Sequence, residues 1–181
     1  MEVTLSRGFQ ALIDDEDYNL IKVFKWHVIP QRNTFYAASR ENNNGKRRLV
    51  YMHRLILRLP HFVPMIDHKD MNGLNNCKDN LRICTRNQNH QNTPKARGIY
   101  TSVFKGVSWI KHIKKWRACI AIDRKGYHIG VYRNEIDAAL AYDNRAKELF
   151  GEFARLNFPK QEVNVENNTM IPLFVCGGLY D

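Results

Sequence analysis

The sequence predicts an α+β protein made of short strands and few helices, and three observations support this fold class. Residues 1–50 form a β-rich part, in which strand-like runs at 34–40 and 47–52 flank the hairpin signal Asn44-Gly45. Residues 51–98 combine a helical run with a segment rich in asparagine, aspartate and histidine. Residues 99–160 show three runs of alternating polar and apolar residues, followed by one helix that should cover the resulting sheet. The last stretch, 161–181, shows no clear period and is expected to form a tail.

The composition and charge restrict the partners of this chain. It has 181 residues and an apolar content of 44%, enough for one ordinary domain or two small ones. The formal net charge of +10 predicts an acidic partner, with nucleic acid ahead of an anionic membrane surface. No apolar run approaches the ~18 residues of a membrane-spanning helix, and the N-terminus lacks the apolar core of a signal peptide. We therefore expect a cytoplasmic protein without membrane contacts.

Two features could indicate minor metal sites. The chain has four cysteines, namely Cys77, Cys84, Cys119 and Cys176. None of them forms a Cys-x-x-Cys pair. Free thiols in a reducing compartment are the preferred interpretation. The alternative is a structural zinc site that Cys77 and Cys84 share with a histidine, either His61 or His90, although the spacing matches no common zinc module. The acidic run at 14–17 is interpreted as a solvated turn rather than as a metal site.

The segment before the asparagine-rich stretch is expected to be a helix over 52–59. Its apolar residues recur at helical spacing and form one buried face, and Pro60 ends the helix. His53 and Arg54 fall on the other side of this helix. They are expected to be exposed, either as an ordinary solvated face or near a nucleic acid.

The polar stretch at 65–92 contains too few apolar residues to fold by burial alone, so it is a loop or a site. A strand is expected at 63–68 and a second at 81–85, with a loop between them. Thr85 is a good N-cap, which places Asn89 early on a following helix. The order of strand, loop, strand and helix would bring polar side chains together between the strands and the helix.

The residues of this stretch can supply what phosphodiester hydrolysis requires: a general base, a cation and a group that orients the base. His68 suits the base, because an ordinary histidine with a pKa of roughly 6.5 is mostly neutral at pH 7. Asp67 and Asn89 offer hard oxygen ligands for Mg²⁺ or Mn²⁺ and leave room for water and phosphate oxygens. Asn80 can hydrogen-bond the His68 ring and fix its tautomer.

The same stretch resembles the HNH (ββα-metal) endonucleases, particularly the HNH homing endonucleases of phages and introns. The resemblance rests on a spaced set of motifs: Asp67-His68, Asn72-Gly73, Asn75-Asn76, Asn80-Leu81-Arg82 and Asn89. It implies that His68 is the general base and that Asn80 orients it. It also implies that Asp67 and Asn89 bind the metal, with asparagine as a common family variant of histidine at the last position.

The residues at 95–133 are strongly basic, with ten lysines or arginines and one acid, Asp123. This surplus exceeds what solubility requires and indicates a surface that contacts phosphates. Strand alternation turns Trp116 and Ala118 toward the helix and Arg117 to the opposite face. The residues expected to contact DNA are Lys105, Ser108, Arg117 and His128 on the sheet, with Lys111, Lys114, Lys115, Arg124 and Lys125 in hairpin turns at its rim.

The basic unit resembles the AP2 DNA-binding domain over most of that domain's length. The matching segments are Phe104-Lys105-Gly106-Val107, Lys115-Trp116-Arg117-Ala118, Ile129-Gly130-Val131-Tyr132, the helical run at 137–143 and Ala154-Arg155-Leu156-Asn157-Phe158-Pro159. The resemblance implies a three-stranded antiparallel sheet that lies in the DNA major groove, with one helix behind it. The helix is expected to begin after Asn134 and to bury a face that includes Ile136 and Leu140. Plant members place a base-reading arginine where Ser108 stands, so the target sequence does not transfer.

The residues and the two resemblances together predict a nuclease of two parts. Residues 1–98 would form the HNH endonuclease domain, with a β-rich lead-in at 1–50 and the ββα-metal core at 51–98. Residues 99–160 would anchor it on double-stranded DNA in a bacterial or phage-infected cell. A homing role is favoured over restriction or phage competition, and the oligomeric state stays open. The alternative from another class is a sequence-specific DNA-binding regulator that retains an inactive HNH remnant.

Overall fold

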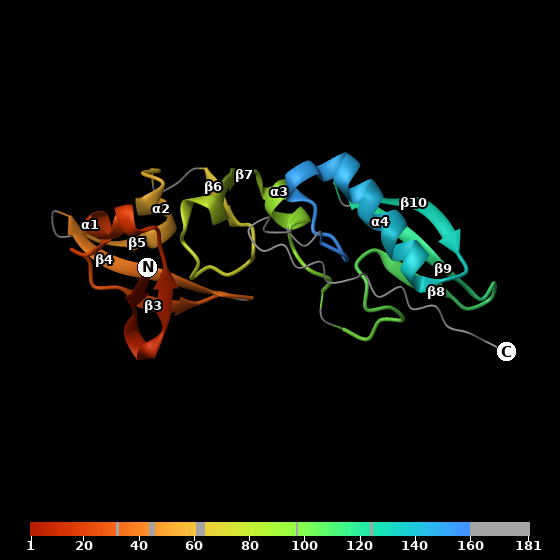
Figure 1. The fold of residues 1–181 in the computed structure, drawn as a ribbon, viewed down its shortest axis with the longest axis horizontal. Coiled ribbons are helices and arrows are strands. Elements are labelled where there is room, and N and C mark those ends of the chain that lie inside the picture. Colours follow the sequence, from red (N-terminus) through yellow and green to blue (C-terminus); the bar gives the residue numbers. More distant parts are fainter. Residues whose placement is uncertain (32, 44–45, 61–63, 97, 124, 160–181) are drawn as a thin grey trace, which may run out of the picture.

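The computed structural model describes residues 1–31, 33–43, 46–60, 64–96, 98–123 and 125–159. The predictions for the Asn44-Gly45 turn, His61, Arg124 and the tail at 161–181 therefore lie outside the described residues. The described residues form a mixed α+β fold with several small antiparallel sheets and few helices, which confirms the predicted class. Figure 1 shows an elongated molecule, with the N-terminal strands at one end and the C-terminal sheet and helix at the other. Within the described part of the chain, no helix is long and apolar enough to cross a membrane.

The N-terminal part contains two small antiparallel sheets and short helices. The strands are β1 (Glu2–Thr4) and β2 (Gln10–Leu12) in the first sheet, and β3 (His27–Pro30), β4 (Phe35–Asn43) and β5 (Lys46–Tyr51) in the second. The α-helices are α1 (Tyr18–Ile21) and α2 (Met52–Ile56), and single 3-10 turns are η1 (Ser6–Gly8) and η2 (Asp15–Asp17). The expected helix at 52–59 is thus present but shorter. In the second sheet β4 is central and pairs with both neighbours.

One hydrophobic core joins this part to the next two strands, β6 (Met65–His68) and β7 (Leu81–Cys84). Its fully or nearly buried side chains are Leu5, Ala11, Ile13, Ile21, Trp26, Val28, Ala37, Met52, Ile56, Ile66 and Leu81. The β-rich lead-in and the polar stretch therefore share one core. Burial of apolar area in the lead-in supplies the stability that the polar stretch lacks.

His53 lies on a buried side of α2, which corrects the expectation of an exposed face. Only 8% of its surface is exposed. The helix is covered on two sides, because Met52 and Ile56 enter the core while His53 packs against the rings of Tyr36 and Tyr51. Helical periodicity identified the first side only, since the second side is covered by aromatic residues from β4 and β5.

The C-terminal unit is a three-stranded antiparallel sheet with one long helix. The strands are β8 (Val107–Ile110), β9 (Lys115–Ile122) and β10 (Lys125–Tyr132), in the order β10-β9-β8. Helix α4 (Glu135–Phe150) packs on one face of this sheet, and the 3-10 turn η4 (Gly151–Phe153) follows it. The predicted alternation in β9 is confirmed, because Ala118 and Ile120 are buried while Arg117 and Ala121 are exposed. Lys115 and Lys125 begin strands, which corrects their placement in turns.

Helix α4 is turned differently on the sheet than its apolar residues suggested. Ile136 and Leu140 are 57% and 45% exposed, whereas the buried residues are Ala138, Ala139, Tyr142, Asp143 and Ala146. Small alanines allow the helix to approach the sheet closely. Asp143 faces inward because its carboxylate accepts hydrogen bonds from the backbone amides of Asn157 and Phe158 at 2.8 Å. The packing of the following segment therefore sets the buried face of the helix.

Candidate active site

The polar stretch folds as two antiparallel strands followed by a short helix, as predicted. Strand β6 pairs with β7 so that Asp67 lies opposite Arg82. A 3-10 turn, η3 (Lys78–Asn80), leads into β7, and α3 (Arg86–Gln91) comes after it. Thr85 caps α3 in a capping box, since its side chain and that of Gln88 accept each other's backbone N–H groups. The cap fixes the start of the helix that carries Asn89.

A pocket of about 620 Å³ opens between these elements and the beginning of β4. Asp67 and His68 line it from β6, and Asn89 lines it from α3. Phe35 and Tyr36 line it from the beginning of β4. The structure therefore brings three of the four predicted site residues to one cavity.

The surroundings of His68 keep its imidazole neutral. Only 4% of its surface is exposed, and burial lowers its pKa, although the Asn76 side chain and nearby carboxylates oppose this shift. The rings of Tyr36 and His53 pack against the imidazole with centroid distances of 5.5 and 5.2 Å. Within the described residues, Nε2 of His68 and Oδ1 of Asn76 are both buried without a hydrogen-bond partner. A neutral imidazole is the form that can accept a proton.

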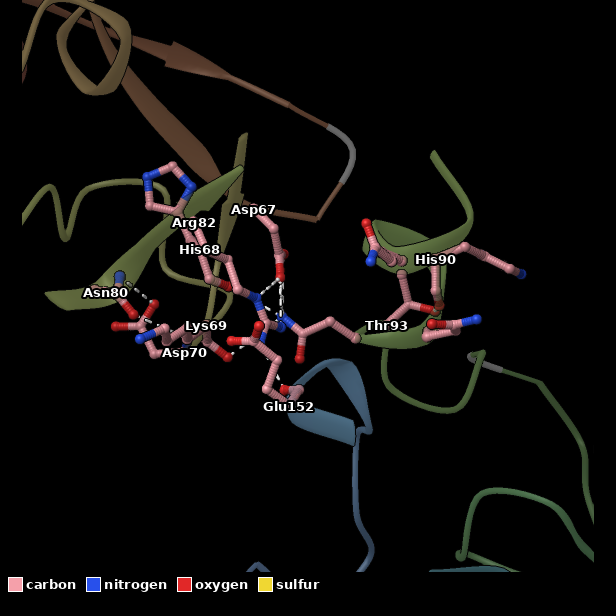
Figure 2. A network of polar contacts seen from close by, with 12 residues as sticks. Asp67, His68, Lys69, Asp70, Asn80, Arg82, His90, Thr93 and Glu152 are labelled. Atoms are coloured by element: carbon pink, nitrogen blue, oxygen red, sulfur yellow. Dashed lines mark hydrogen bonds and ion pairs between the residues drawn. The ribbon is translucent and has the colours of Figure 1, made fainter. Parts of the chain in front are cut away.

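The carboxylate of Asp67 is buried and held by two neighbours. Arg82 donates to Oδ2 from Nε and Nη2 at 2.8 and 2.6 Å. Asn92 donates from Nδ2 to both carboxylate oxygens at 3.1 Å and to the His68 carbonyl at 3.1 Å. Figure 2 shows this network, in which dashed lines join Asp67 to its partners. These contacts fix the direction of the carboxylate.

Asn80 has partners other than the predicted His68. Its Nδ2 donates to Oδ1 of Asp70 at 2.9 Å and to the carbonyl of Asn75 at 2.8 Å. Its Oδ1 accepts from the backbone N–H of Asp70 at 3.1 Å. The Asn80 amide therefore closes the loop between β6 and β7, and the predicted bond to the His68 ring is not formed in this structure.

The β-rich lead-in holds the same loop from the other side. Leu12 exchanges backbone hydrogen bonds of 2.8 Å with Leu74 and Asn76. Asp14 accepts from the backbone N–H of Lys78 at 2.7 Å, and the Lys78 ammonium lies 2.9 Å from Asp17. The acidic run at 14–17 is thus bound to the loop, which corrects its interpretation as a solvated turn.

Comparison with known proteins adds a second kind of evidence. No family model matches the chain. Over 92 residues it is 36% identical to Protein 3.8 of Escherichia phage T7, an alignment that covers 50% of this chain and 73% of that protein. Over 154 residues it is 30% identical to a protein of Acanthamoeba polyphaga mimivirus named uncharacterized HNH endonuclease L560, covering 83% of this chain and 76% of that protein. The chain belongs to the HNH endonuclease family.

Four residues around the pocket of this HNH endonuclease escaped sequence reasoning. Arg82 carried no predicted role beyond its place in the Asn80-Leu81-Arg82 motif, yet its pairing opposite Asp67 follows from the strand register. Asn92 lies three residues after Asn89, a spacing that places both near one side of a helix. Tyr36 and His53 carried no local signal, because their contact with His68 joins segments far apart in the sequence.

The donors at the pocket fit a hard divalent cation in kind. Asp67 offers a carboxylate and Asn89 an amide oxygen on the same cavity. Oδ1 of Asp67 accepts only from Asn92 among the described residues, so it retains acceptor capacity. Within the same residues, no group of three or more histidine, cysteine, aspartate or glutamate side chains could hold a metal ion, so Cys77 and Cys84 form no zinc cluster with His90. The zinc alternative with His61 lies outside the described residues. Cys77, Cys84 and Cys119 are free thiols, as expected.

Most of the predicted DNA contacts lie at the exposed surface of the C-terminal unit. Ser108 and Arg117 are partners in adjacent strands, and Nε of Arg117 donates to Oγ of Ser108 at 3.3 Å. His128 lies opposite Cys119. The exposed lysines of the turn and of the strand starts are Lys111, Lys114, Lys115 and Lys125.

Lys105 departs from this group. It precedes β8 instead of belonging to it, and its Nζ donates to the carbonyls of Gln91 and Thr93 at 2.8 and 2.6 Å. Burial lowers its pKa to about 8. The ammonium therefore joins the C-terminal unit to the end of α3, which corrects its placement on the outer face of the sheet.

Proposed function

We propose that this HNH endonuclease hydrolyses phosphodiester bonds of double-stranded DNA with Mg²⁺ or Mn²⁺, in the manner of a homing endonuclease anchored by an AP2-like sheet. The observation that carries the proposal is the convergence of Asp67, His68 and Asn89 on one pocket. The surplus of ten basic residues over one acid at 95–133 supports DNA as the polymer. The family membership supports nuclease chemistry.

The residues would share the work as follows. The neutral His68 takes a proton from the attacking water, whose oxygen forms a bond to phosphorus while the bond to the leaving sugar oxygen breaks. Asp67 and Asn89 would hold the cation, which would neutralise negative charge on the phosphate and on the departing oxygen. Arg82 and Asn92 keep the Asp67 carboxylate in place through the hydrogen bonds described above.

The first test replaces the base. His68→Ala should lose about 10²–10⁴-fold in cleavage rate and retain DNA binding, because the proposed phosphate contacts lie elsewhere. The assay is nicking or linearisation of a mixed-sequence plasmid pool, with binding measured separately by fluorescence anisotropy. His90→Ala is a matched control, since His90 is exposed on α3. Near-normal cleavage by the His68 variant would refute the assignment.

The second test concerns the cation. EDTA should stop cleavage, and added Mg²⁺ or Mn²⁺ should restore it. Asp67→Asn and Asn89→Ala should each shift the metal titration of the cleavage rate to higher concentration, whereas Asn19→Ala at the exposed end of α1 should not. Full activity in EDTA contradicts the proposal, as does a requirement that only Zn²⁺ meets.

The same experiments separate the alternative function. A DNA-binding regulator with an inactive HNH remnant would bind the plasmid pool and leave it intact with every metal. Such an outcome would keep the C-terminal unit as a DNA anchor and remove the nuclease assignment.

A further inference from the structure

Half of the β4–β5 hairpin stands apart from the rest of its sheet. Strand β3 pairs with β4 only from Phe35 to Ala38, whereas β5 continues the pairing to Asn43. The paired segments 40–43 and 46–49, here called the ribbon, are therefore two-stranded. Arg40, Glu41, Asn42, Arg47 and Arg48 are exposed along it. A two-stranded ribbon of this kind adds little to the hydrophobic core. Its exposed cations therefore do not serve to stabilise the fold.

Among the side chains that the structure describes, the net charge of the ribbon is divided unevenly between its two faces. Directly paired residues share a face, and Arg40 pairs with Leu49 while Arg47 pairs with Asn42. Both arginines lie on the same face, because Arg40 and Asn42 are two residues apart in β4. Arg48 lies on the opposite face, across from Glu41. Among the described residues, none of the three arginines forms an ion pair.

The face with Arg40 and Arg47 continues the face of β4 that meets the pocket. Strand alternation places Tyr36 on that face, and its ring packs 5.5 Å from the His68 ring. At about 3.3 Å per residue, Arg40 lies roughly 13 Å along β4 from Tyr36. Asn42, the partner of Arg47 in the other strand, lies roughly 20 Å from Tyr36. Duplex DNA rises about 3.4 Å per base pair, so these distances correspond to roughly four and six base pairs.

The ribbon also lies on the far side of the pocket from the C-terminal sheet. In Figure 1 the labels of β4 and β5 are near one end of the molecule, whereas β8, β9 and β10 are at the other. Strands β6 and β7 and helix α3 lie between them. A duplex that crosses the pocket toward the C-terminal sheet would extend past the ribbon in the other direction.

We propose that the ribbon is a second DNA-binding surface, in which Arg40 and Arg47 bind backbone phosphates on the side of the cleavage site opposite the C-terminal sheet. A two-stranded ribbon has dimensions that fit a DNA groove. The inference rests on the proposed function, because it takes double-stranded DNA as the ligand. It adds that the protein holds the duplex on both sides of the pocket. If the ribbon were only solvated, substitutions on its two faces would not differ in their effect on DNA binding.

The test uses the full chain and a fluorescein-labelled 30-base-pair duplex of mixed sequence, in EDTA so that binding is separated from cleavage. Anisotropy titrations over a series of KCl concentrations give the slope of log K against log salt. Arg40→Ala and Arg47→Ala should each reduce the slope by about 0.9, and the double variant by about 1.8. If only phosphate contacts are lost, the double variant binds about sixtyfold more weakly at 0.1 M salt. Arg47→Lys should retain most of the slope, since it keeps the charge.

Arg48→Ala is the matched control, since it removes the same charge from the opposite face. It should leave the slope nearly unchanged, and none of the variants should change the melting temperature. Equal losses from Arg48→Ala and Arg47→Ala would overturn the proposal, as would wild-type slopes in the double variant. Those results leave the proposed function intact if Arg117→Ala weakens binding. Failure of the wild-type chain to bind the duplex at all would refute both.

Discussion

At the scale of single residues, the most informative side chain is one that the proposed chemistry does not use directly. His53 is buried, and among the described residues its Nδ1 has no hydrogen-bond partner. Burial lowers its pKa to about 3, and the neighbouring His68 and Arg54 act in the same direction. Its ring lies edge-on to the His68 ring. A second neutral imidazole thus forms part of the wall behind the proposed base.

The buried His53 should make the protein sensitive to acid. Its pKa is about 3 in the folded chain and ordinarily about 6.5 when unfolded, so below pH 6.5 the unfolded chain binds more protons. Stability should fall as the pH drops from about 6.5 toward 3, by an amount on the order of 3 kcal/mol at pH 4. His53→Phe keeps a ring at this place and should remove that part of the loss. Urea unfolding at pH 7 and pH 4 measures it.

His112→Phe provides the control for that experiment, because His112 is exposed in the β8–β9 turn. It should retain the full acid sensitivity of the wild-type chain. The interpretation of His53 is wrong if both variants lose the same stability between pH 7 and pH 4.

Residue types and spacing predicted the groups that carry the chemistry but not their neighbours. Asp67, His68 and Asn89 could be predicted because each has the chemistry that the reaction needs and the strand–loop–strand–helix order brings them together. Asn80 was assigned to His68 by that reasoning, yet its amide bonds to Asp70 and Asn75. Spacing cannot decide between two acceptors that are both within reach of a short side chain.

At the scale of elements, alternation predicted the faces of the strands well, whereas helical spacing predicted the buried face of α4 poorly. A side chain of β9 can point to only one of two faces, and Ala118 and Ile120 lie on the face that α4 covers. Helix α4 offers a continuous range of orientations. Its orientation is set by the hydrogen bonds of Asp143 with the following segment and by the contact of the Tyr142 ring with Gly106, where no Cβ would fit. Neither contact is visible in the periodicity of the helix.

The two faces of β9 should respond to substitution in opposite ways. Trp116 is half-buried on the helix side and lies 4.9 Å from Trp109, so Trp116→Ala should cost about 2–3 kcal/mol, less than a fully buried aromatic. Arg117 is exposed, so Arg117→Ala should leave the melting temperature nearly unchanged. It should weaken DNA binding by ~1–3 kcal/mol if the side chain reads a base.

Arg145→Ala on the outer side of α4 is the control for charge, and it should change neither quantity appreciably. The comparison uses thermal unfolding and anisotropy on the same preparations. A domain that unfolds on Arg117→Ala and only binds more weakly on Trp116→Ala would mean that the sheet faces the other way.

At the scale of the whole molecule, Arg82 connects the pocket to the C-terminal unit. Its side chain is 9% exposed and pairs with Asp67, while its Nη1 donates to the carbonyl of Glu152 at 2.5 Å. Its guanidinium also lies 4.0 Å from the centre of the Phe153 ring. A single side chain therefore contacts both the proposed metal ligand and the turn η4 that follows α4.

Arg82→Met should destabilise the protein by about 3–5 kcal/mol, because it leaves the Asp67 carboxylate buried without its cation. Urea unfolding at pH 7 measures this change. Glu152→Gln is the matched control and should cost much less, since the shorter contact of Arg82 is with the Glu152 carbonyl and the carboxylate lies 3.6 Å away. Equal stability of the Arg82 variant and the wild-type chain would show that the pair contributes little.

Hydrogen bonds from two lysines hold the described part of the connection between α3 and the C-terminal unit. Lys95 donates from Nζ to the carbonyls of Ser102 and Phe104 at 2.9 and 2.8 Å, and Lys105 binds the end of α3. A glycine- and serine-rich tether would let the pocket sample many positions along the DNA. A connection fixed in this way keeps the pocket at a constant distance from the C-terminal sheet. Under the proposed function, the cut would fall at a constant number of base pairs from the sequence that the C-terminal sheet contacts.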